Sequence, residues 1–279
     1  MQTRIAVALA AAAPLLWAPV RSHAQDFWSR DFIAPGTETW TIDVGGIVNR
    51  FDSTLRLNGE NSRGTDINLE NNDLDRNLSS FEAGLSWRFL PRHRLDVRYY
   101  GTKRDGSRSY NSEIDIGDAT FPVGANVSVQ SKNEIFDVNY RYSIAKDTAS
   151  EIALLAGLYG GRVSYDVDAV GVSNGVQRTY HKSVSTTIPL PVLGASFDWY
   201  PDPQWKLSAE LAGMKAKIGD VDGHAYLAAG AVEYMVVRNF GVGLRYGYTD
   251  VKADVSKTEF NGTLAFKINA VSAYAKFVF

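Results

Sequence analysis

The sequence predicts an all-β protein, a closed antiparallel up-and-down transmembrane β-barrel of about 10 strands, with 8 or 12 strands as alternatives. Three observations predict this class. Apolar and polar residues alternate along many segments, tight connections alternate with long ones, and aromatic residues gather beside the tight connections. After residue 25, no stretch holds the roughly 18 uncharged apolar residues that a membrane-spanning helix needs, so strands are the expected crossing elements.

The first 24 residues have the pattern of a secretory signal peptide. Arg4 provides a positive start, an apolar run over 5–17 follows, and Ser22-His23-Ala24 forms a small-x-small cleavage site. The apolar run is too short for a membrane anchor. We therefore expect a signal peptide over 1–24, export from the cytoplasm, and one barrel domain over 25–279.

Composition removes several classes of function. The 29 basic and 31 acidic residues give a formal net charge of −2, so there is no global basic field that would hold nucleic acid. The chain contains no cysteine, which excludes a disulfide framework, a thiolate metal site and a cysteine nucleophile. We expect no nucleic-acid partner and no cofactor.

Strict alternation of apolar and polar residues marks the predicted strands. From Phe81 to Phe89, apolar residues occupy one face and Glu82, Gly84, Ser86 and Arg88 the other. Charged residues recur opposite large apolar ones, so in a membrane barrel the charged face lines a wet lumen. The predicted lumen-lining charges have both signs and should pair across the lumen: Glu82, Arg88, Asp96, Arg98, Asp137, Arg141, Glu210, Glu233 and Arg245.

The lengths of the connections separate a membrane barrel from a soluble sandwich. Connections near 90–92, 145–149, 201–203 and 238–239 are tight, whereas those near 58–78, 106–130, 166–183 and 253–259 are long; the hairpin at 219–223 is the exception. Short turns at one end and long loops at the other are typical of outer-membrane barrels. The strand candidates run over 38–57, 79–90, 93–105, 131–145, 150–165, 184–200, 204–218, 224–237, 240–252 and 260–279.

Aromatic residues are concentrated beside the chain ends and the tight turns. Amphipathic rings favour the level where lipid meets water, so we expect these side chains to form a girdle at the periplasmic interface. The predicted interface aromatics are Trp40, Trp87, Phe89, Tyr142, Trp199, Trp205, Phe240 and Phe277.

The last nine residues alternate in the same way and end in Phe279. This end resembles the C-terminal signature of bacterial outer-membrane β-barrel proteins, with a general likeness to the small-barrel group around OmpA, OmpX and OmpW. The resemblance implies an outer-membrane location, Phe279 as an assembly signal, and the barrel-assembly machinery and periplasmic chaperones as partners in biogenesis. It also implies contact with outer-membrane lipids and lipopolysaccharide. We expect a monomer, because the predicted lipid face shows no polar seam.

Residues in the last strand break the alternation. Phe266 and Ile268 have the opposite parity to Phe277 and Phe279. The pattern predicts either a β-bulge near 269–270 or an outer part of the strand that lies above the bilayer, where parity is free.

Few residues suggest catalysis or metal binding. His181-Lys182-Ser183 resembles the His-x-Ser pair of outer-membrane lipid hydrolases, in which the His acts as general base for the Ser, but Val184 stands where those enzymes carry Asn. The acidic stretch over 66–75 fails the calcium-loop pattern and is expected to be a solvated loop. The sequence therefore predicts a barrel that is not an enzyme, holds no metal, and has a structural or narrow-channel role for passive small solutes. The alternatives are an outer-leaflet lipid hydrolase that uses His181 and Ser183, and a surface adhesin that acts through the long external loops near 106–130 and 166–183.

Overall fold

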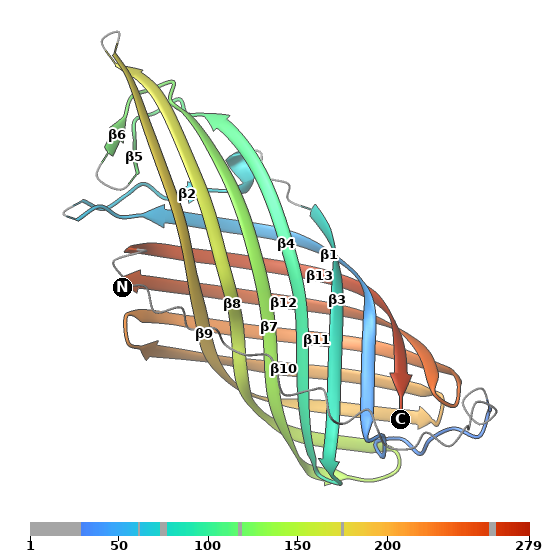
Figure 1. Cartoon of the computed structure of the whole chain (residues 1–279). Helices are drawn as coiled ribbons and strands as arrows, with labels where there is room; N and C mark the ends of the chain where they lie inside the picture. The colour runs from blue at the N-terminus through green and yellow to red at the C-terminus, as the bar shows by residue number, and fades with distance from the viewer. Residues whose placement is uncertain (1–28, 61, 73–76, 117–118, 174–175, 257–260) are drawn as a thin grey trace, which may run out of the picture.

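The computed structural model describes residues 29–60, 62–72, 77–116, 119–173, 176–256 and 261–279, so the predicted signal peptide lies outside the described residues. Ten long antiparallel strands dominate the molecule (Figure 1). They are β1 (Trp40–Leu57), β3 (Asn77–Leu90), β4 (His93–Ser109), β7 (Asn126–Lys146), β8 (Ser150–Ser173), β9 (Val176–Asp202), β10 (Trp205–Ile218), β11 (Val221–Val237), β12 (Phe240–Ser256) and β13 (Asn261–Val278).

Short elements lie in two of the long connections. Between β1 and β3, the strand β2 (Ile67–Asn68) pairs with β1 and is followed by the 3-10 helix η1 (Glu70–Asn72). Between β4 and β7, the strands β5 (Ile114–Ile116) and β6 (Ala119–Phe121) form a separate hairpin. Among the described residues, no helix is long and apolar enough to cross a membrane.

The first and last strands close the sheet into a barrel. β1 pairs with β13 from Thr41–Val278 to Leu57–Gly262 without a register shift. Closure satisfies backbone groups that an open edge would leave unpaired in hydrocarbon, where each costs several kcal/mol. The predicted closed antiparallel barrel of about ten strands is confirmed.

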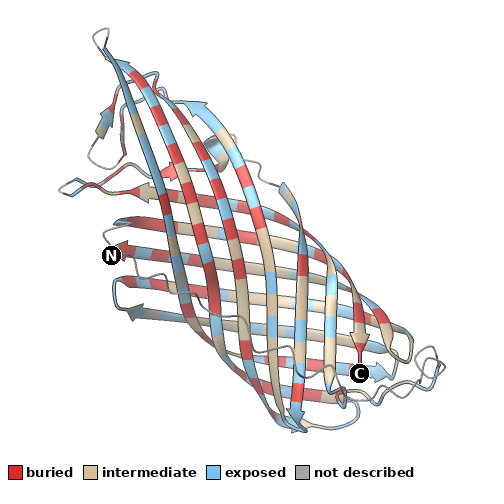
Figure 2. Ribbon diagram, in the orientation of Figure 1, coloured by how far each residue is buried: buried red, intermediate tan, exposed pale blue. Residues whose placement is uncertain are grey.

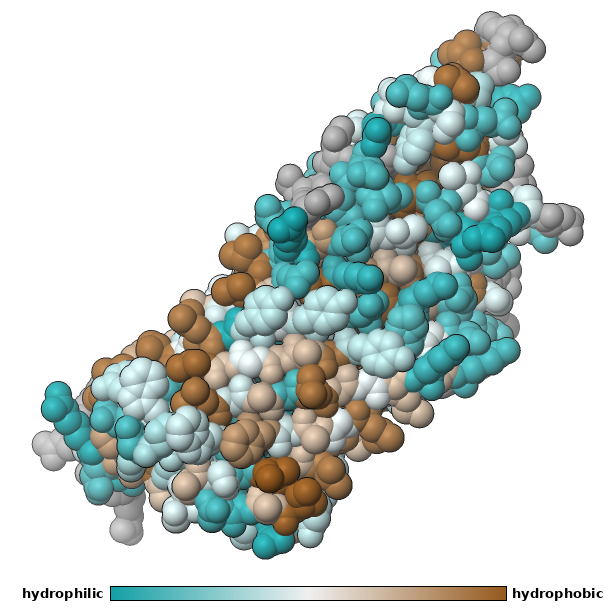
Figure 3. Space-filling model, turned by 180° about the vertical axis from the view of Figure 1, so that it is seen from behind, coloured by the Kyte–Doolittle hydropathy of each residue, from teal (hydrophilic) through white to brown (hydrophobic). Residues whose placement is uncertain are grey.

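Burial alternates along the strands (Figure 2), and the chemistry of the inward and outward faces exchanges along the barrel, as β7 illustrates. Its outward side chains are apolar or aromatic from Phe136 to Ile144 and polar from Ser128 to Glu134. Its inward side chains do the reverse: polar between 137 and 143, and apolar at Val127 and Val129. Nine residues of apolar exterior match the length that a tilted strand needs to cross a bilayer. Figure 3 shows the same division, with brown apolar surface over one part of the barrel and teal polar surface over the part beyond it.

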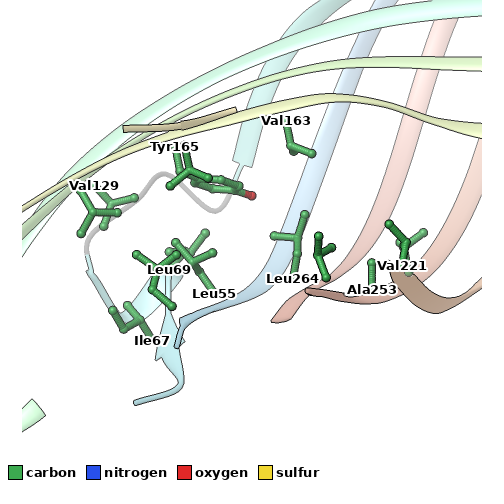
Figure 4. Close-up of a cluster of buried hydrophobic side chains, with 14 of the residues drawn as sticks. Leu55, Ile67, Leu69, Val129, Val163, Tyr165, Val221, Ala253 and Leu264 are labelled. Carbon is green, nitrogen blue, oxygen red and sulfur yellow. The ribbon is translucent and has the colours of Figure 1, made fainter. Parts of the chain in front are cut away.

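The barrel splits into two sheets in its outer part. The β9–β10 ladder ends at the pair Leu193–Gly213, and the β3–β4 ladder ends at Glu82–Tyr100. Beyond these points, β4, β7, β8 and β9 form one sheet that faces β10–β13 and β1 (Figure 1). A cluster of buried apolar side chains fills the space between the sheets (Figure 4). The outer part is therefore built like a soluble β-sandwich with a dry core.

Several predicted loops are in fact strand. The predicted long loop over 166–183 is wrong, because β8 continues to Ser173 and β9 begins at Val176. The segments over 106–130 and 253–259 likewise lose residues to β4, β7 and β12. The reason is the exchange of faces: in this region apolar residues point inward, so the alternation has the opposite sense and contains many polar residues.

The same exchange explains the broken parity of β13. Its ladders with β1 and β12 are continuous through 269–270, so there is no bulge there. Ile268 is buried at 3% exposure and Phe266 packs against the apolar cluster. Of the two predicted explanations, the structure supports the second, in which the outer part of β13 has a different parity.

The tight turns at the opposite end are held by local hydrogen bonds. In the turn between β7 and β8, the backbone N–H groups of Ala149 and Ser150 donate to the Asp147 carboxylate at 2.8 and 2.7 Å. These bonds favour the charged form and hold the pKa of that carboxyl below its ordinary value.

Candidate functional site

The charged interior of the membrane-length part is the first candidate site. All nine residues predicted to line the lumen border one or both of two interior cavities, whose volumes are about 90 and 80 Å³. They come from β3, β4, β7, β10, β11 and β12. The strands bring acidic and basic side chains together across the lumen, so the interior is largely filled by ion pairs.

One ion pair links β3 to β8. The Arg88 guanidinium donates to both carboxylate oxygens of Glu151, with Nη1–Oε1 at 3.1 Å and Nη2–Oε2 at 2.8 Å. Both side chains are 5% exposed or less, and the Ser143 hydroxyl donates a further bond to Glu151. Such a bidentate geometry is the strongest arrangement of these groups.

A second network joins β4, β7, β9 and β10. Arg141 donates to Asp96 and to Glu210. Arg94 lies 3.5 Å from Asp198, and the Lys206 ammonium lies 3.2 Å from the same carboxylate.

A third network lies beside the closure of the barrel. The Lys276 ammonium donates to Glu233 at 2.6 Å, and the Tyr274 hydroxyl donates to its other oxygen at 2.8 Å. Arg245 lies 3.2 Å from Glu82, with its guanidinium 4.4 Å from the centre of the Tyr274 ring.

The predicted lumen residues include both members of three of these pairs, Arg141–Asp96, Arg141–Glu210 and Arg245–Glu82, but neither member of the pairs that Asp198 makes with Arg94 and Lys206. Glu151, Asp198 and Lys206 were not predicted as lumen residues, although each has the inward parity of its strand. Extending the parity of each strand to its end would have found them. The register that pairs them across the lumen is not written in any single strand.

Above the charged networks, the interior becomes mainly apolar, although a few buried polar side chains remain, among them Asn49, Asn133 and Arg104. The hydroxyls of Tyr100 and Tyr159 lie 3.2 Å apart near this boundary. Beyond them, buried side chains from both sheets fill the interior, among them Leu55, Val129 and Leu264, each 1% exposed or less (Figure 4). The packed side chains of this cluster fill the space between the sheets, so the described residues close the outer part of the lumen.

The connection between β1 and β3 folds into this closure through a buried ion pair. Arg104 Nη1 donates to Glu70 Oε1 at 2.8 Å, and both side chains are 1% exposed. Ser53 donates to Glu70 through its backbone N–H at 2.6 Å and through its hydroxyl at 2.8 Å. The Arg104 guanidinium lies 4.0 Å from the centre of the Phe51 ring.

This arrangement corrects the prediction that the acidic stretch over 66–75 is a solvated loop. Glu70 is buried because Arg104 and Ser53 replace the water that a carboxylate otherwise requires. Asp66, which is half exposed, pairs with Arg56 at 3.1 Å. Asp73 and Asp75 lie outside the described residues. The described residues contain no group of three or more carboxylate or imidazole side chains that could hold a metal ion.

The predicted interface aromatics all have the outward parity of their strands and lie near the tight turns or the chain end. Trp40 and Trp87 stack with ring centres 5.2 Å apart. Phe240 and Phe277 are 5.4 Å apart. Their position at a lipid–water interface stays a prediction.

The last residue of the chain is hydrogen-bonded to the start of β1. The N–H groups of Thr39 and Trp40 donate to the Phe279 carbonyl at 2.8 and 3.1 Å, and the Phe279 N–H donates to the Trp40 carbonyl at 2.9 Å. The Phe279 side chain is 51% exposed. Its role as an assembly signal stays a prediction.

The His181–Ser183 pair acquires a partner in the structure. His181 Nδ1 lies 2.7 Å from Asp168 Oδ1, on the neighbouring strand β8. Sequence reasoning did not find this carboxylate, which stands directly opposite His181 in the ladder. The three side chains point outward into the polar exterior of the barrel, beyond the apolar exterior that ends at Leu158 on β8. Among the described residues, no hydrogen bond joins Ser183 to His181.

Comparison with solved structures identifies the fold. The outer membrane protease OmpT from Escherichia coli is 11% identical, with a TM-score of 0.58 over 86% of this chain and 96% of that chain. Ail, the attachment invasion locus protein of Yersinia pestis, is 11% identical with a TM-score of 0.29 over 87% of this chain and 100% of that chain. The Pseudomonas putida toluene transporter TodX is 7% identical with a TM-score of 0.36, over 86% and 89%.

No protein-family model matches the chain, and no curated protein sequence is significantly similar to it. The structure is that of a small outer-membrane β-barrel, and its likeness to OmpT concerns the fold alone.

Proposed function

We propose that this protein is a sealed outer-membrane barrel that displays its outer two-sheet part at the cell surface, in a structural and non-enzymatic role. The observation that supports the proposal is the filled interior. Ion pairs occupy the membrane-length part, and a dry apolar cluster joined by the Glu70–Arg104 pair closes the outer part. Of the two roles predicted from the sequence, this arrangement favours the structural role over the passive channel.

The chemistry of the barrel exterior indicates what surrounds each part of the barrel. The apolar band faces outer-membrane lipids, and the polar exterior beyond it meets lipopolysaccharide and external water. In this proposal the chain is a monomer located in the outer membrane.

Conductance tests the proposal. Folded protein, shown to be folded by a change of electrophoretic mobility on boiling, is reconstituted into planar bilayers beside a general porin as positive control. A sealed barrel is expected to give no discrete current steps at moderate voltage. Regular steps of stable size from the purified protein would overturn the proposal and restore the passive channel.

A hydrolase is the second candidate, favoured by the His181–Asp168 hydrogen bond, which orients an imidazole as a catalytic base requires. Against it, His181 is 67% exposed on the polar exterior, away from the apolar band where the acyl chains of lipids lie. Phospholipid and lipid A cleavage by wild type and Ser183→Ala decides the matter. Activity that is present in the wild type and lost in this variant would establish the hydrolase.

A further inference from the structure

The outer part of β9 has a strand partner on one side only. Its ladder with β8 is continuous from Val176 to Trp199, whereas its ladder with β10 extends from Asp202 only to Leu193. Pro191 and Pro189 follow directly beyond this point. Proline has no N–H to donate to a ladder and is confined to edges within sheets, so these residues mark where the pairing with β10 stops.

The two places where the barrel splits differ in how the strand edge is covered. At the split between β3 and β4, η1 covers the outer part of β4 through the Glu70–Arg104 pair and through Arg108, which donates to the Asn71 carbonyl at 2.5 Å. At the split between β9 and β10, no backbone hydrogen bond from the described residues reaches the outer side of the segment 181–187. We call this segment the open edge.

Basic side chains line both sides of this split. Arg178 and Lys182 lie on β9 with inward parity, and Lys215 and Lys217 lie on β10 with outward parity; all four are exposed. None has a carboxylate of the described residues within 4 Å, although Asp222 stands opposite Lys217 in the ladder. Natural edge strands carry lysine to discourage unwanted pairing, and the same charges favour a partner that carries acidic side chains.

We propose that the open edge binds an extended acidic segment of another protein by β-strand addition. Main-chain hydrogen bonds to the open edge supply affinity, and carboxylates beside Arg178 and Lys182, which share one face of β9, supply selectivity. The inference rests on the proposed function, since it requires the outer part to be displayed outside the cell.

A second copy in the same membrane does not fit the open edge. All copies in one membrane point the same way, so two β9 strands cannot run antiparallel. With strands tilted by about 45°, a two-fold axis along the membrane normal makes them cross rather than pair. The partner is therefore a different chain.

Peptide binding tests the proposal. The probe is a fluorescent peptide of about eight residues that alternates Val and Glu, added to the folded full-length protein in detergent micelles and followed by anisotropy. Ser185 has the parity of Pro189 and Pro191, so its N–H points away from β8. Ser185→Pro removes that donor from the open edge and leaves the ladder with β8 intact, while Ser185→Ala is the matched control for the lost hydroxyl.

We expect saturable binding to wild type and to Ser185→Ala, and binding weaker by about tenfold or more for Ser185→Pro. A peptide methylated on alternate backbone nitrogens and a peptide with Lys in place of Glu should also bind about tenfold more weakly. Equal binding by Ser185→Pro, or by either altered peptide, would overturn the proposal, as would no saturable binding to wild type. Failure here with no current steps in bilayers leaves the sealed barrel standing, whereas current steps overturn the sealed barrel whatever the peptide does.

Discussion

Replacing Glu70 with Gln tests whether the buried ion pair fastens the closure of the barrel. The substitution keeps the size of the side chain and removes the charge that faces Arg104 at 2.8 Å. Both side chains are 1% exposed, so the Arg104 guanidinium would stay buried without a counter-charge. Breaking a buried pair in this way costs about 3–5 kcal/mol. We expect Glu70→Gln to lower the free energy of unfolding by that amount.

The assay is equilibrium unfolding of the barrel by urea in lipid vesicles, followed by tryptophan fluorescence. Trypsin cleavage after Arg63, whose side chain is 75% exposed, reports separately on release of the connection between β1 and β3. Asp66→Asn is the matched control, because it removes a half-exposed partner of Arg56 from the same connection. Exposed pairs are worth about 0–1 kcal/mol, so this variant should unfold almost like wild type.

A double variant separates the charge from the packing. Glu70→Gln with Arg104→Met removes the unpaired charge and keeps an oxygen that can accept from Ser53, so it should be more stable than Glu70→Gln alone. The reasoning fails if Glu70→Gln and Asp66→Asn lose similar amounts of stability and are cleaved by trypsin at similar rates.

Three further predictions concern the exterior, the chain end and the lumen. Leu154→Arg places a charge on the apolar exterior and should cost about 2–4 kcal/mol in vesicles, whereas Ser128→Arg on the polar exterior should change stability by less than about 1 kcal/mol; equal losses would contradict the assignment of the band. Phe279→Ala should lower the yield of folded barrel in cells while leaving refolding of purified protein into detergent unchanged. The amount of heat-modifiable protein is measured for both. Glu233→Gln leaves the Lys276 ammonium buried without its partner and should destabilise the barrel by about 3–5 kcal/mol. A Glu233→Gln variant as stable as wild type would contradict this prediction.

The sequence predicted the fold and the charged interior because both depend on local alternation. Arg88 and Glu233 could be placed in the lumen from parity alone, since a charged residue on the apolar exterior of a membrane barrel is costly. Parity also puts Glu151 and Lys276 on the inward face, but their pairing with Arg88 and Glu233 required the register between strands, which alternation does not contain. Glu70 was missed for a different reason: it lies in a segment that was predicted to be a solvated loop, and only Arg104 and Ser53, on two other strands, make its burial favourable.

The predicted loops failed where the solvent changes. Within a bilayer the medium outside the barrel is apolar, so apolar side chains face outward. Above the bilayer water surrounds the strands, and burial of apolar side chains inside becomes favourable. Strands as long as β8 and β9 cross from one medium to the other, so their alternation reverses without a bulge. A prediction that assumes one sense of alternation therefore ends β4, β8 and β9 too early on their outer side.

The same reversal has a consequence for transport. An outer part that folds as a two-sheet structure needs a dry core between its sheets, and this core lies in line with the lumen of the membrane-length part. Lengthening the strands beyond the bilayer therefore replaces a water-filled path with packed apolar side chains, as Leu55 and Val167 illustrate. It also separates β9 from β10, because two flat sheets meet at edges that a round barrel does not have. Sealing of the lumen and exposure of a strand edge are thus two results of one geometric change.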